Sequence, residues 1–413
     1  MTIRRISLAA GLVLAAAGCN NEALVTPPVP QYAGGAMFQR YVAMGNSITA
    51  GFQSGGINDS TQKQSYVGLV ADKMGSPFYY PSLTKPGCPP PIDTVFTATG
   101  VPHRLGGGTA ATCFFRAPTI PPFLTNVAVP GAEALDLLKN GPGPGTNSNA
   151  LTLLMLGGRT QIQAMMAAHP TFVSVWAGNN DVLGAATNSV NAGDSTLITP
   201  IATFQTTYAD IVDSVSASGA SAILIGVANV TAIPFFSQGA TYYAIRNGLV
   251  PGQPGDTFPS ADSLFHVDPL CAPSAFGGKG DSVLVPFPFG GALLGAAQAG
   301  VNDTLHCAEP QTVQPAELVK LLTTVAAYNA FIVSQATAKN WAYLDPNTAL
   351  DSLRLIPTQV APFPNFKAAC SGAPFGLGFT CDGVHPSAST HLIIARHIVQ
   401  AINAKYGSAI PAP

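Results

Sequence analysis

Charged side chains are scarce in this chain: they make up 9% of 413 residues, and no run of lysine or arginine occurs. The 18 basic residues nearly balance the 20 acidic ones. Because nucleic-acid binding depends on clustered positive charge, we expect no nucleic-acid partner. The cysteines form no C-x-x-C pair and the histidines show no metal-type spacing, so no zinc or redox motif is indicated.

Hydrophobic residues, glycine and proline are abundant instead. Hydrophobic residues account for 47% of the chain, which also contains 42 glycines and 36 prolines. The length permits one large domain or two ordinary ones. The glycine and proline content predicts long irregular connections between its elements.

The N-terminal residues have the features of an export signal. Arg4 and Arg5 precede a short apolar stretch, Ile6–Ala17, and small residues then lead to Cys19. This order is typical of a secretory signal peptide, and the cysteine resembles that of a bacterial lipobox. The apolar stretch is too short to favour a transmembrane helix. An ordinary signal peptide with an incidental cysteine is the alternative.

We therefore expect residues 1–18 to be removed and Cys19 to be lipidated. The polar, proline-rich residues 19–36 then form a tether, which would place the protein in a bacterial cell envelope, at the outer membrane or cell surface. The six remaining cysteines suggest disulfides in an exported protein, although 15 pairings are possible. Pairing sequence neighbours is the simplest arrangement: Cys88–Cys113, Cys271–Cys307 and Cys370–Cys381.

Apolar runs alternate with helical patterns along the rest of the chain. Alternation of this kind predicts a parallel sheet with helices on both faces. The five expected strands are Tyr41–Met44, Thr125–Val129, Phe172–Ala177, Ala222–Val227 and Trp341–Leu344. One expected helix begins at Tyr66 and ends near Gly75. The others are Ala132–Leu138, Thr160–Ala168, Pro200–Ala217, Pro315–Ala338 and Ser387–Tyr406.

Two long segments, 76–123 and 232–314, interrupt this alternation. Each is rich in proline and glycine and contains two cysteines. We interpret them as disulfide-stapled insertions at the rim of a site, because long loops of this kind are uncommon unless functional. The expected organisation is therefore a single domain over residues 37–408, followed by a short tail, 409–413.

The tetrad Asp382-Gly383-Val384-His385 contains an acid and an imidazole that one tight turn can bring together. The carboxylate can orient the imidazole, whose other nitrogen is then free to act as a base. Its complement is Ser47, which follows the first strand in a glycine-flanked segment. We expect Ser47 to be a nucleophile, His385 its base and Asp382 the residue that orients the base.

An acyl-transfer site also needs donors for the oxyanion. The candidates are the backbone N–H groups of Ser47 and Gly131 and the side-chain amide of Asn180, all just past predicted strand ends. Ligands bind at this edge in parallel sheets. Each residue also has a plainer explanation: Ser47 and Asn180 are common helix caps, and Gly131 suits an ordinary turn.

The order of these blocks resembles the SGNH/GDSL hydrolase superfamily. The Ser block is Gly45-Asn46-Ser47-Ile48, in which Asn46 and Ile48 depart from the usual Asp and Leu. The blocks Gly178–Asp181 and Asp382–His385 match fully, and the match at Gly131 is looser. The resemblance implies a flavodoxin-like, three-layer α/β/α fold and ester hydrolysis without metal or cofactor.

Another segment, Gly280-Asp281-Ser282-Val283, matches the GDSL letters more closely than Gly45–Ile48 does. No apolar strand precedes it and it lies inside an insertion, so we interpret it as a turn. The resemblance also implies a structural role for Asp181, so that only Asn180 of the Gly178–Asp181 block carries chemistry.

The sequence thus predicts an exported serine esterase acting on lipid or short-acyl carboxylic esters. A carbohydrate acetylesterase, acting on an acylated glycan, is the alternative within hydrolases. A surface binding lipoprotein that kept the fold but lost turnover is the alternative outside them. The expected partners are an ester substrate and, through the lipid, a membrane; the oligomeric state is left open.

Overall fold

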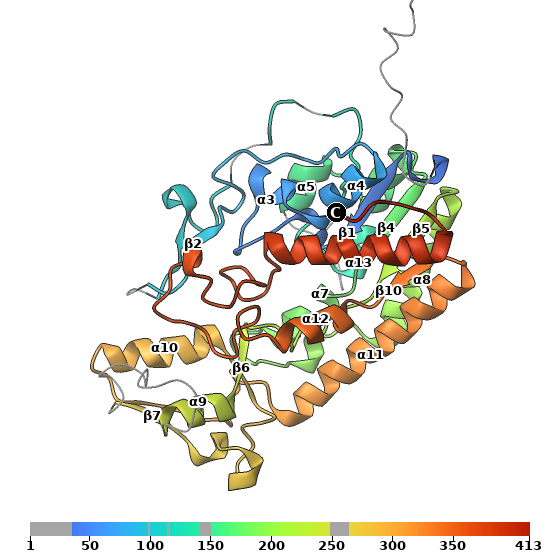
Figure 1. Ribbon diagram of the computed structural model, residues 1–413. Coiled ribbons are helices and arrows are strands. Elements are labelled where there is room, and N and C mark those ends of the chain that lie inside the picture. The colour runs from blue at the N-terminus through green and yellow to red at the C-terminus, as the bar shows by residue number, and fades with distance from the viewer. Residues whose placement is uncertain (1–34, 98–99, 114–115, 120, 141–149, 248–263) are drawn as a thin grey trace, which may run out of the picture.

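A computed structural model describes most of the chain beyond residue 34 (Figure 1). The described residues are 35–97, 100–113, 116–119, 121–140, 150–247 and 264–413. The predicted signal peptide, Cys19 and almost all of the tether lie outside the described residues.

A parallel sheet forms the centre of the fold. Its four strands, in the order β1-β4-β5-β10, are all parallel to their neighbours. Their bounds are Tyr41–Gly45 for β1, Phe172–Trp176 for β4, Ser221–Ile225 for β5 and Ala342–Leu344 for β10. These are four of the five strands that the apolar runs predicted, and the α/β fold class is confirmed.

The fifth predicted strand, Thr125–Val129, forms only an isolated parallel bridge between Asn126 and Ala43. Backbone bonds still join it to β1, since Ala43 N–H donates to Thr125 and Val127 N–H donates to Ala43. The Asn126 side chain turns back, donating to the carbonyl of Thr49 and accepting from the N–H of Ala128. The segment therefore lies along the edge of the sheet without becoming a regular strand.

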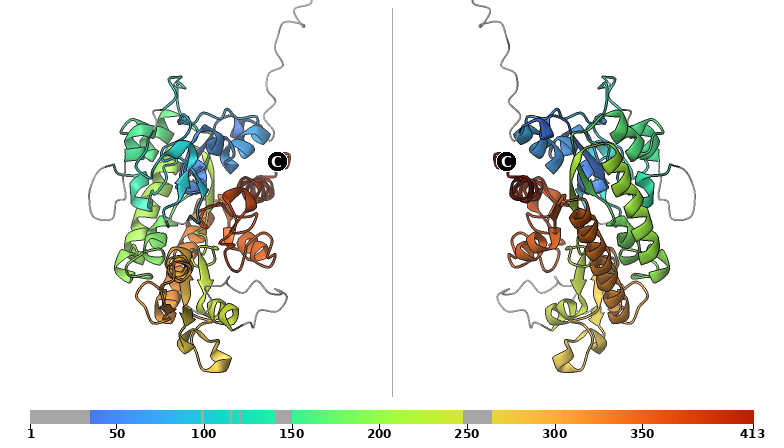
Figure 2. Two further views of the ribbon diagram at one scale, coloured as in Figure 1. Left: turned by 90° about the vertical axis from the view of Figure 1, so that its left-hand side faces the viewer. Right: turned by 90° about the vertical axis from the view of Figure 1, so that its right-hand side faces the viewer.

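Helices cover both faces of the sheet, because alternate strand residues point to opposite sides. On one face α4 (Tyr66–Met74) and α13 (Ala388–Tyr406) pack against Tyr41, Ala43 and Ile223. On the other, α6 (Gln161–Ala167), α8 (Ile201–Ala217) and α11 (Pro315–Ala338) pack against the alternate strand residues. In side view α8 and α13 lie on opposite sides of the sheet (Figure 2).

Helix α11 is, within the described residues, the one helix long and apolar enough to cross a membrane. Its Leu321, Val325 and Ile332 belong to the hydrophobic core, and Asn329 bonds both the N–H and the carbonyl of Val227. Helix α11 is thus a helix of the folded domain that has the length and apolar composition of a membrane span.

Most predicted helices are observed within a residue or two of the expected bounds. The exception is Ala132–Leu138, which contains a 3-10 helix over Ala134–Leu137 rather than an α-helix. Glu133 and Asp136 form a capping box at its start, and Leu138 is its C-cap. A further helix that was not predicted, α5 (Ala150–Leu156), precedes α6.

The first insertion is a small antiparallel pair, β2 (Ile92–Thr94) and β3 (His103–Arg104). The disulfide Cys88–Cys113 closes it, as the pairing of sequence neighbours predicted. The third predicted disulfide, Cys370–Cys381, is also present and ends one residue before Asp382.

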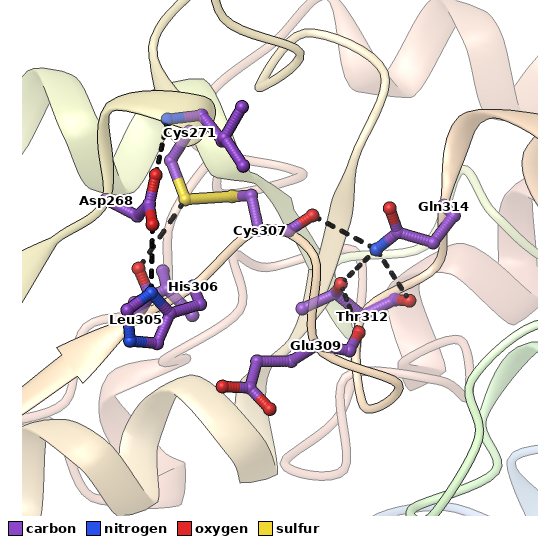
Figure 3. The surroundings of a disulfide bond; sticks show 9 residues. Asp268, Cys271, Leu305, His306, Cys307, Glu309, Thr312 and Gln314 are labelled. Atoms are coloured by element: carbon purple, nitrogen blue, oxygen red, sulfur yellow. Dashed lines mark hydrogen bonds and ion pairs between the residues drawn. A yellow bond between two sulfur atoms is a disulfide. The ribbon is translucent and has the colours of Figure 1, made fainter.

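The second insertion has regular structure of its own rather than being a loop. It contains the pairs β6–β8 and β7–β9, two helices and a separate hydrophobic cluster. The disulfide Cys271–Cys307 lies among Asp268, His306 and Gln314 (Figure 3). The bounds are β6 Phe236–Gln238, α9 Gly239–Arg246, β7 Phe265–Val267, β8 Leu284–Pro286, α10 Phe287–Gln298 and β9 Asp303–Leu305.

Candidate active site

A sharp turn after β1 presents Ser47 at the first position of the short helix α2 (Ser47–Ala50). Gly45 has φ +152°, and a Cβ there would lie 2.4 Å from the carbonyl oxygen of Trp176, so only glycine fits. The Gln161 side chain bonds both the N–H and the carbonyl of Gly45, at 2.8 Å each. The backbone that leads into the serine is therefore held on both sides.

The predicted nucleophile, base and orienting acid lie in one hydrogen-bonded chain. Ser47 Oγ is 2.9 Å from His385 Nε2, and His385 Nδ1 is 2.7 Å from Asp382 Oδ2. An ionised carboxylate can only accept, so Nδ1 carries the proton and Nε2 is left as the acceptor for the serine hydroxyl. The ring of Phe52 packs against the imidazole at 4.9 Å between centroids.

Asp382 is held ionised by a ring of donors. Its Oδ1 accepts from the backbone N–H groups of Val384 and His385, both at 2.9 Å, and the Thr380 hydroxyl is 3.1 Å away. Burial raises the pKa of the Asp382 carboxyl. The charge of His385 and these hydrogen bonds outweigh burial and bring the pKa to about 2. Asp382 is therefore negative throughout the physiological range.

Two further residues, which the sequence did not indicate, support Asp382. The N–H of Gly55 donates to Asp382 Oδ2, and Arg104 Nη1 donates to the carbonyl of Gly55 at 2.7 Å. Burial lowers the pKa of the Arg104 guanidinium, and the charge of Asp382 acts against that shift. The first insertion thus contributes a half-buried cation behind the acid. No local motif marks such a contact, because it depends on where the insertion folds.

The predicted oxyanion donor Asn180 lines the same cavity as Ser47 and His385. Asn180 begins α7 (Asn180–Ala186), and its Nδ2 donates one hydrogen to the carbonyl of Ala132 at 2.8 Å. This bond places the loop containing Gly131 beside Asn180, and Gly131 has φ +82°. The amide nitrogen of asparagine carries two hydrogens, so one remains for a ligand. Ser47, at the start of α2, has no intrahelical partner for its N–H.

Asn46, which stands where the family usually has Asp, forms hydrogen bonds on both sides of the serine turn. Its Oδ1 accepts from the N–H of Ile48 at 3.1 Å and caps α2, while its Nδ2 donates to Asn179 Oδ1 at 3.3 Å. The amide thus links the serine turn to the Gly178–Asp181 block, which a carboxylate, lacking a donor, could not do in this way.

Asp181 is buried below this block, as a structural residue. Its Oδ2 accepts from the N–H of Ala134 at 2.9 Å, and Asp136 and Glu133 lie near it. Burial raises the pKa of Asp181 to about 6. Burial, together with the charges of Asp181 and Asp136, raises the pKa of Glu133 to about 8. No reacting group contacts these carboxyls, which pin the 3-10 helix to α7.

The second GDSL-like segment is a turn, as predicted. Asp281 accepts from both the N–H and the hydroxyl of Ser274 at 2.7 Å, and Gly280 packs closely against Cys271. Neither contacts the chain of Ser47, His385 and Asp382. Among the described residues, no group of three or more His, Cys, Asp or Glu side chains could hold a metal ion.

Comparison with known proteins identifies a family for the chain. A family model described as GDSL-like Lipase/Acylhydrolase matches residues 41–247. No curated protein matches the chain.

Two solved structures are similar to this chain at 13% identity. Axe2, an acetylxylan esterase from Geobacillus stearothermophilus, has a TM-score of 0.39; the match covers 90% of this chain and 96% of that one. LAE5, an alpha/beta hydrolase enzyme from the metagenome of Lake Arreo, Spain, has a TM-score of 0.38, with coverages of 92% and 98%.

Proposed function

The chain belongs to the GDSL-like lipase and acylhydrolase family and is an SGNH-type ester hydrolase, and from that premise we propose that it is an exported, lipid-anchored serine esterase. Its substrates are carboxylic esters with a lipid or short-acyl group. One observation carries the proposal: the hydroxyl of Ser47 lies 2.9 Å from the nitrogen of His385 that faces away from Asp382.

In the first half of the reaction, Ser47 Oγ attacks the ester carbonyl carbon while His385 Nε2 takes the hydroxyl proton. A tetrahedral intermediate forms and then collapses. The bond to the alcohol oxygen breaks, and His385 returns the proton to that oxygen. In the second half a water molecule attacks the acyl-serine, with His385 again as base, and the acid leaves.

Negative charge develops on the carbonyl oxygen in both halves. We assign its stabilisation to the N–H groups of Ser47 and Gly131 and to the Asn180 amide. The bond from Asn180 to Ala132 supports this assignment, because it keeps the asparagine and the Gly131 loop in register before substrate binds. Asp382 orients His385 and stabilises its charged form.

The proposed cellular setting follows from the N-terminal sequence and the disulfides. Cleavage after residue 18 would leave Cys19 to carry lipid, and residues 19–36 would tether a single domain, 37–408, to the cell envelope. Three disulfides support export, since such bonds persist mainly in oxidising compartments.

A fluorophosphonate probe tests the assignment of the nucleophile. We expect the purified protein to be labelled on Ser47, and Ser47→Ala to lose both labelling and ester hydrolysis. Ser282→Ala, in the second GDSL-like segment, is the matched control and should label like the parent. A folded protein without labelling, or labelling retained in Ser47→Ala, would favour a binding lipoprotein instead.

A further inference from the structure

A cavity of about 90 Å³ begins at Ser47 and His385 and extends away from the sheet. It lies between α7, the segment after β5, the helix α12 (Pro346–Arg354) and the start of α13. Helix α12 runs next to α13 in both sets of views (Figures 1 and 2). The cavity thus has the reacting groups at one end.

Beyond the reacting groups, the walls are apolar. Leu353 is 9% exposed and closes the side formed by α12. The aliphatic side chains that line the cavity include Leu183, Val230, Ile233, Leu350, Leu353 and Ile393. Such a surface favours hydrocarbon over polar ligands.

Several polar side chains of the wall are engaged within the fold, whereas the indole N–H of Trp176 is buried there without a partner. Asn46 bonds Asn179 at 3.3 Å, and the Thr390 hydroxyl donates to the carbonyl of Gly378 at 2.8 Å. Asn229 Oδ1 accepts from the N–H and hydroxyl of Thr231. A sugar ring placed here would exchange its hydrogen bonds to water for few partners, mainly the amide of Asn180 and the indole N–H of Trp176, and burying the remaining hydroxyls would be costly.

The cavity is also larger than an acetyl group needs. A cavity needs about 10–15 Å³ to hold one water molecule, which is close to a methyl group in size. An acetyl ester would therefore leave most of the apolar volume empty. Each methylene that enters such a site favours binding by about fourfold.

Resting on the proposed esterase function, we propose that this cavity holds the acyl chain of a medium-chain ester, roughly four to eight carbons long, and that α12 sets the permitted length. The carbonyl carbon lies at Ser47, the chain enters the apolar cavity, and the alcohol leaves toward solvent after His385 protonates it.

Hydrolysis of p-nitrophenyl esters from C2 to C12 tests the substrate class. We expect kcat/KM to peak between C4 and C8, with C6 at least tenfold above C2. A peak at C2, in protein that the fluorophosphonate probe still labels on Ser47, would overturn the acyl proposal while leaving the esterase assignment intact. Loss of Ser47 labelling would instead overturn the esterase assignment.

Variants on α12 test the length control. Leu353→Trp fills the cavity and should lower the C8/C2 ratio of kcat/KM at least tenfold. Ala349→Leu, which adds bulk from the same helix, should act in the same direction if Leu353→Trp folds poorly. The matched control is Leu355→Trp, because Leu355 follows α12 and is 84% exposed. A C8/C2 ratio unchanged in both cavity variants would refute the role of α12.

A second series fixes the acyl group and lengthens the alcohol. The proposal requires Leu353→Trp and the parent to show the same profile along this series. A change confined to long alcohols would assign the cavity to the leaving group and overturn the proposal.

Discussion

The Asp382–His385 pair at the edge of the sheet and the Asp268–His306 pair in the second insertion look alike in isolation. Their Nδ1 to carboxylate distances are 2.7 and 2.9 Å. The side chains of the first pair are each 12% exposed, whereas His306 is 50% exposed. The first pair also has Ser47 on its free nitrogen.

The comparison teaches that an acid beside an imidazole is not enough to define a site of this kind. Asp268 has His306 and the N–H of Leu270 as donors, both near the surface, where water screens the pair. Asp382 accepts from several backbone donors, the half-buried Arg104 supports one of them through the carbonyl of Gly55, and His385, its partner, reaches the hydroxyl of Ser47. The two regions differ in the burial of the acid–imidazole pair and in the hydroxyl of Ser47, which only His385 contacts. Each prediction below perturbs one of the two regions.

The largest expected effect comes from Asp382→Asn. An amide cannot accept the Nδ1 proton as a carboxylate does, so His385 loses its tautomer and its stabilised charge. We expect kcat/KM to fall about 10⁴-fold with the fold retained, as measured by ester hydrolysis and circular dichroism. Asp268→Asn is the matched control and should hydrolyse esters within about twofold of the parent. Equal losses in both variants would abolish the distinction between the two pairs.

The next effect concerns the opposite side of the serine. Asn180→Ala removes one oxyanion donor and the bond to Ala132, so kcat should fall about 10²–10³-fold. KM for short-chain esters should change much less, because the donor acts mainly on developing charge. Asn188→Ala, a loop asparagine after α7, serves as control. A rise in KM with unchanged kcat would contradict the assignment of Asn180.

The buried acids below α7 predict a pH dependence of stability. Native Glu133 and Asp181 keep protons that the unfolded chain has lost, since burial raises their pKa values to about 8 and 6. The free energy of unfolding should therefore fall as pH rises from about 4 to about 8. Asp382 acts in the opposite sense: its lowered pKa contributes stability that is lost below about pH 4, toward pH 2.

Urea unfolding at pH 5 and pH 9 checks this dependence. Glu133→Gln should lose less stability than the parent between the two values, because the neutral amide never acquires charge. Glu309→Gln, at an acidic residue of the second insertion, should behave like the parent. The explanation fails if Glu133→Gln and the parent show the same difference.

The smallest expected effect is on the stability of the exposed pair. Asp268→Asn should change the free energy of unfolding by no more than about 0.5–1 kcal/mol, because exposed ion pairs contribute little. Thermal and urea unfolding in low and high salt provide the measurement. A loss of several kcal/mol would mean that the second insertion depends on this pair as strongly as the site depends on Asp382.

Short-range patterns predicted the sheet well, and the three residues that they singled out, Ser47, Asp382 and His385, meet in the structure. Strands β1, β4, β5 and β10 are apolar runs, and α11 begins and ends at the predicted residues. The prediction of a regular strand over Thr125–Val129 was wrong. This segment lies at the edge of the sheet, where the Asn126 side chain is free to form hydrogen bonds with backbone groups. Apolar residues in the sequence do not by themselves distinguish a regular strand from an irregular segment at the sheet edge.

What the sequence did not reveal depends on contacts between distant segments. Arg104 supports Asp382 only because the first insertion folds against Gly55, and α12 forms a wall of the cavity only because it lies across that cavity from the start of α13. The elements inside the second insertion were missed because glycine and proline obscure short strands. No spacing rule connects residues so far apart in the chain.

The reacting serine and histidine are separated by 338 positions in the sequence. A contact of such high sequence separation forms late, since most of the intervening polypeptide must be ordered first. With the proposed roles of Ser47 and His385, a nascent chain would hydrolyse no ester until synthesis has passed His385. A chain terminated before that residue would then be inactive, whatever part of the sheet it forms.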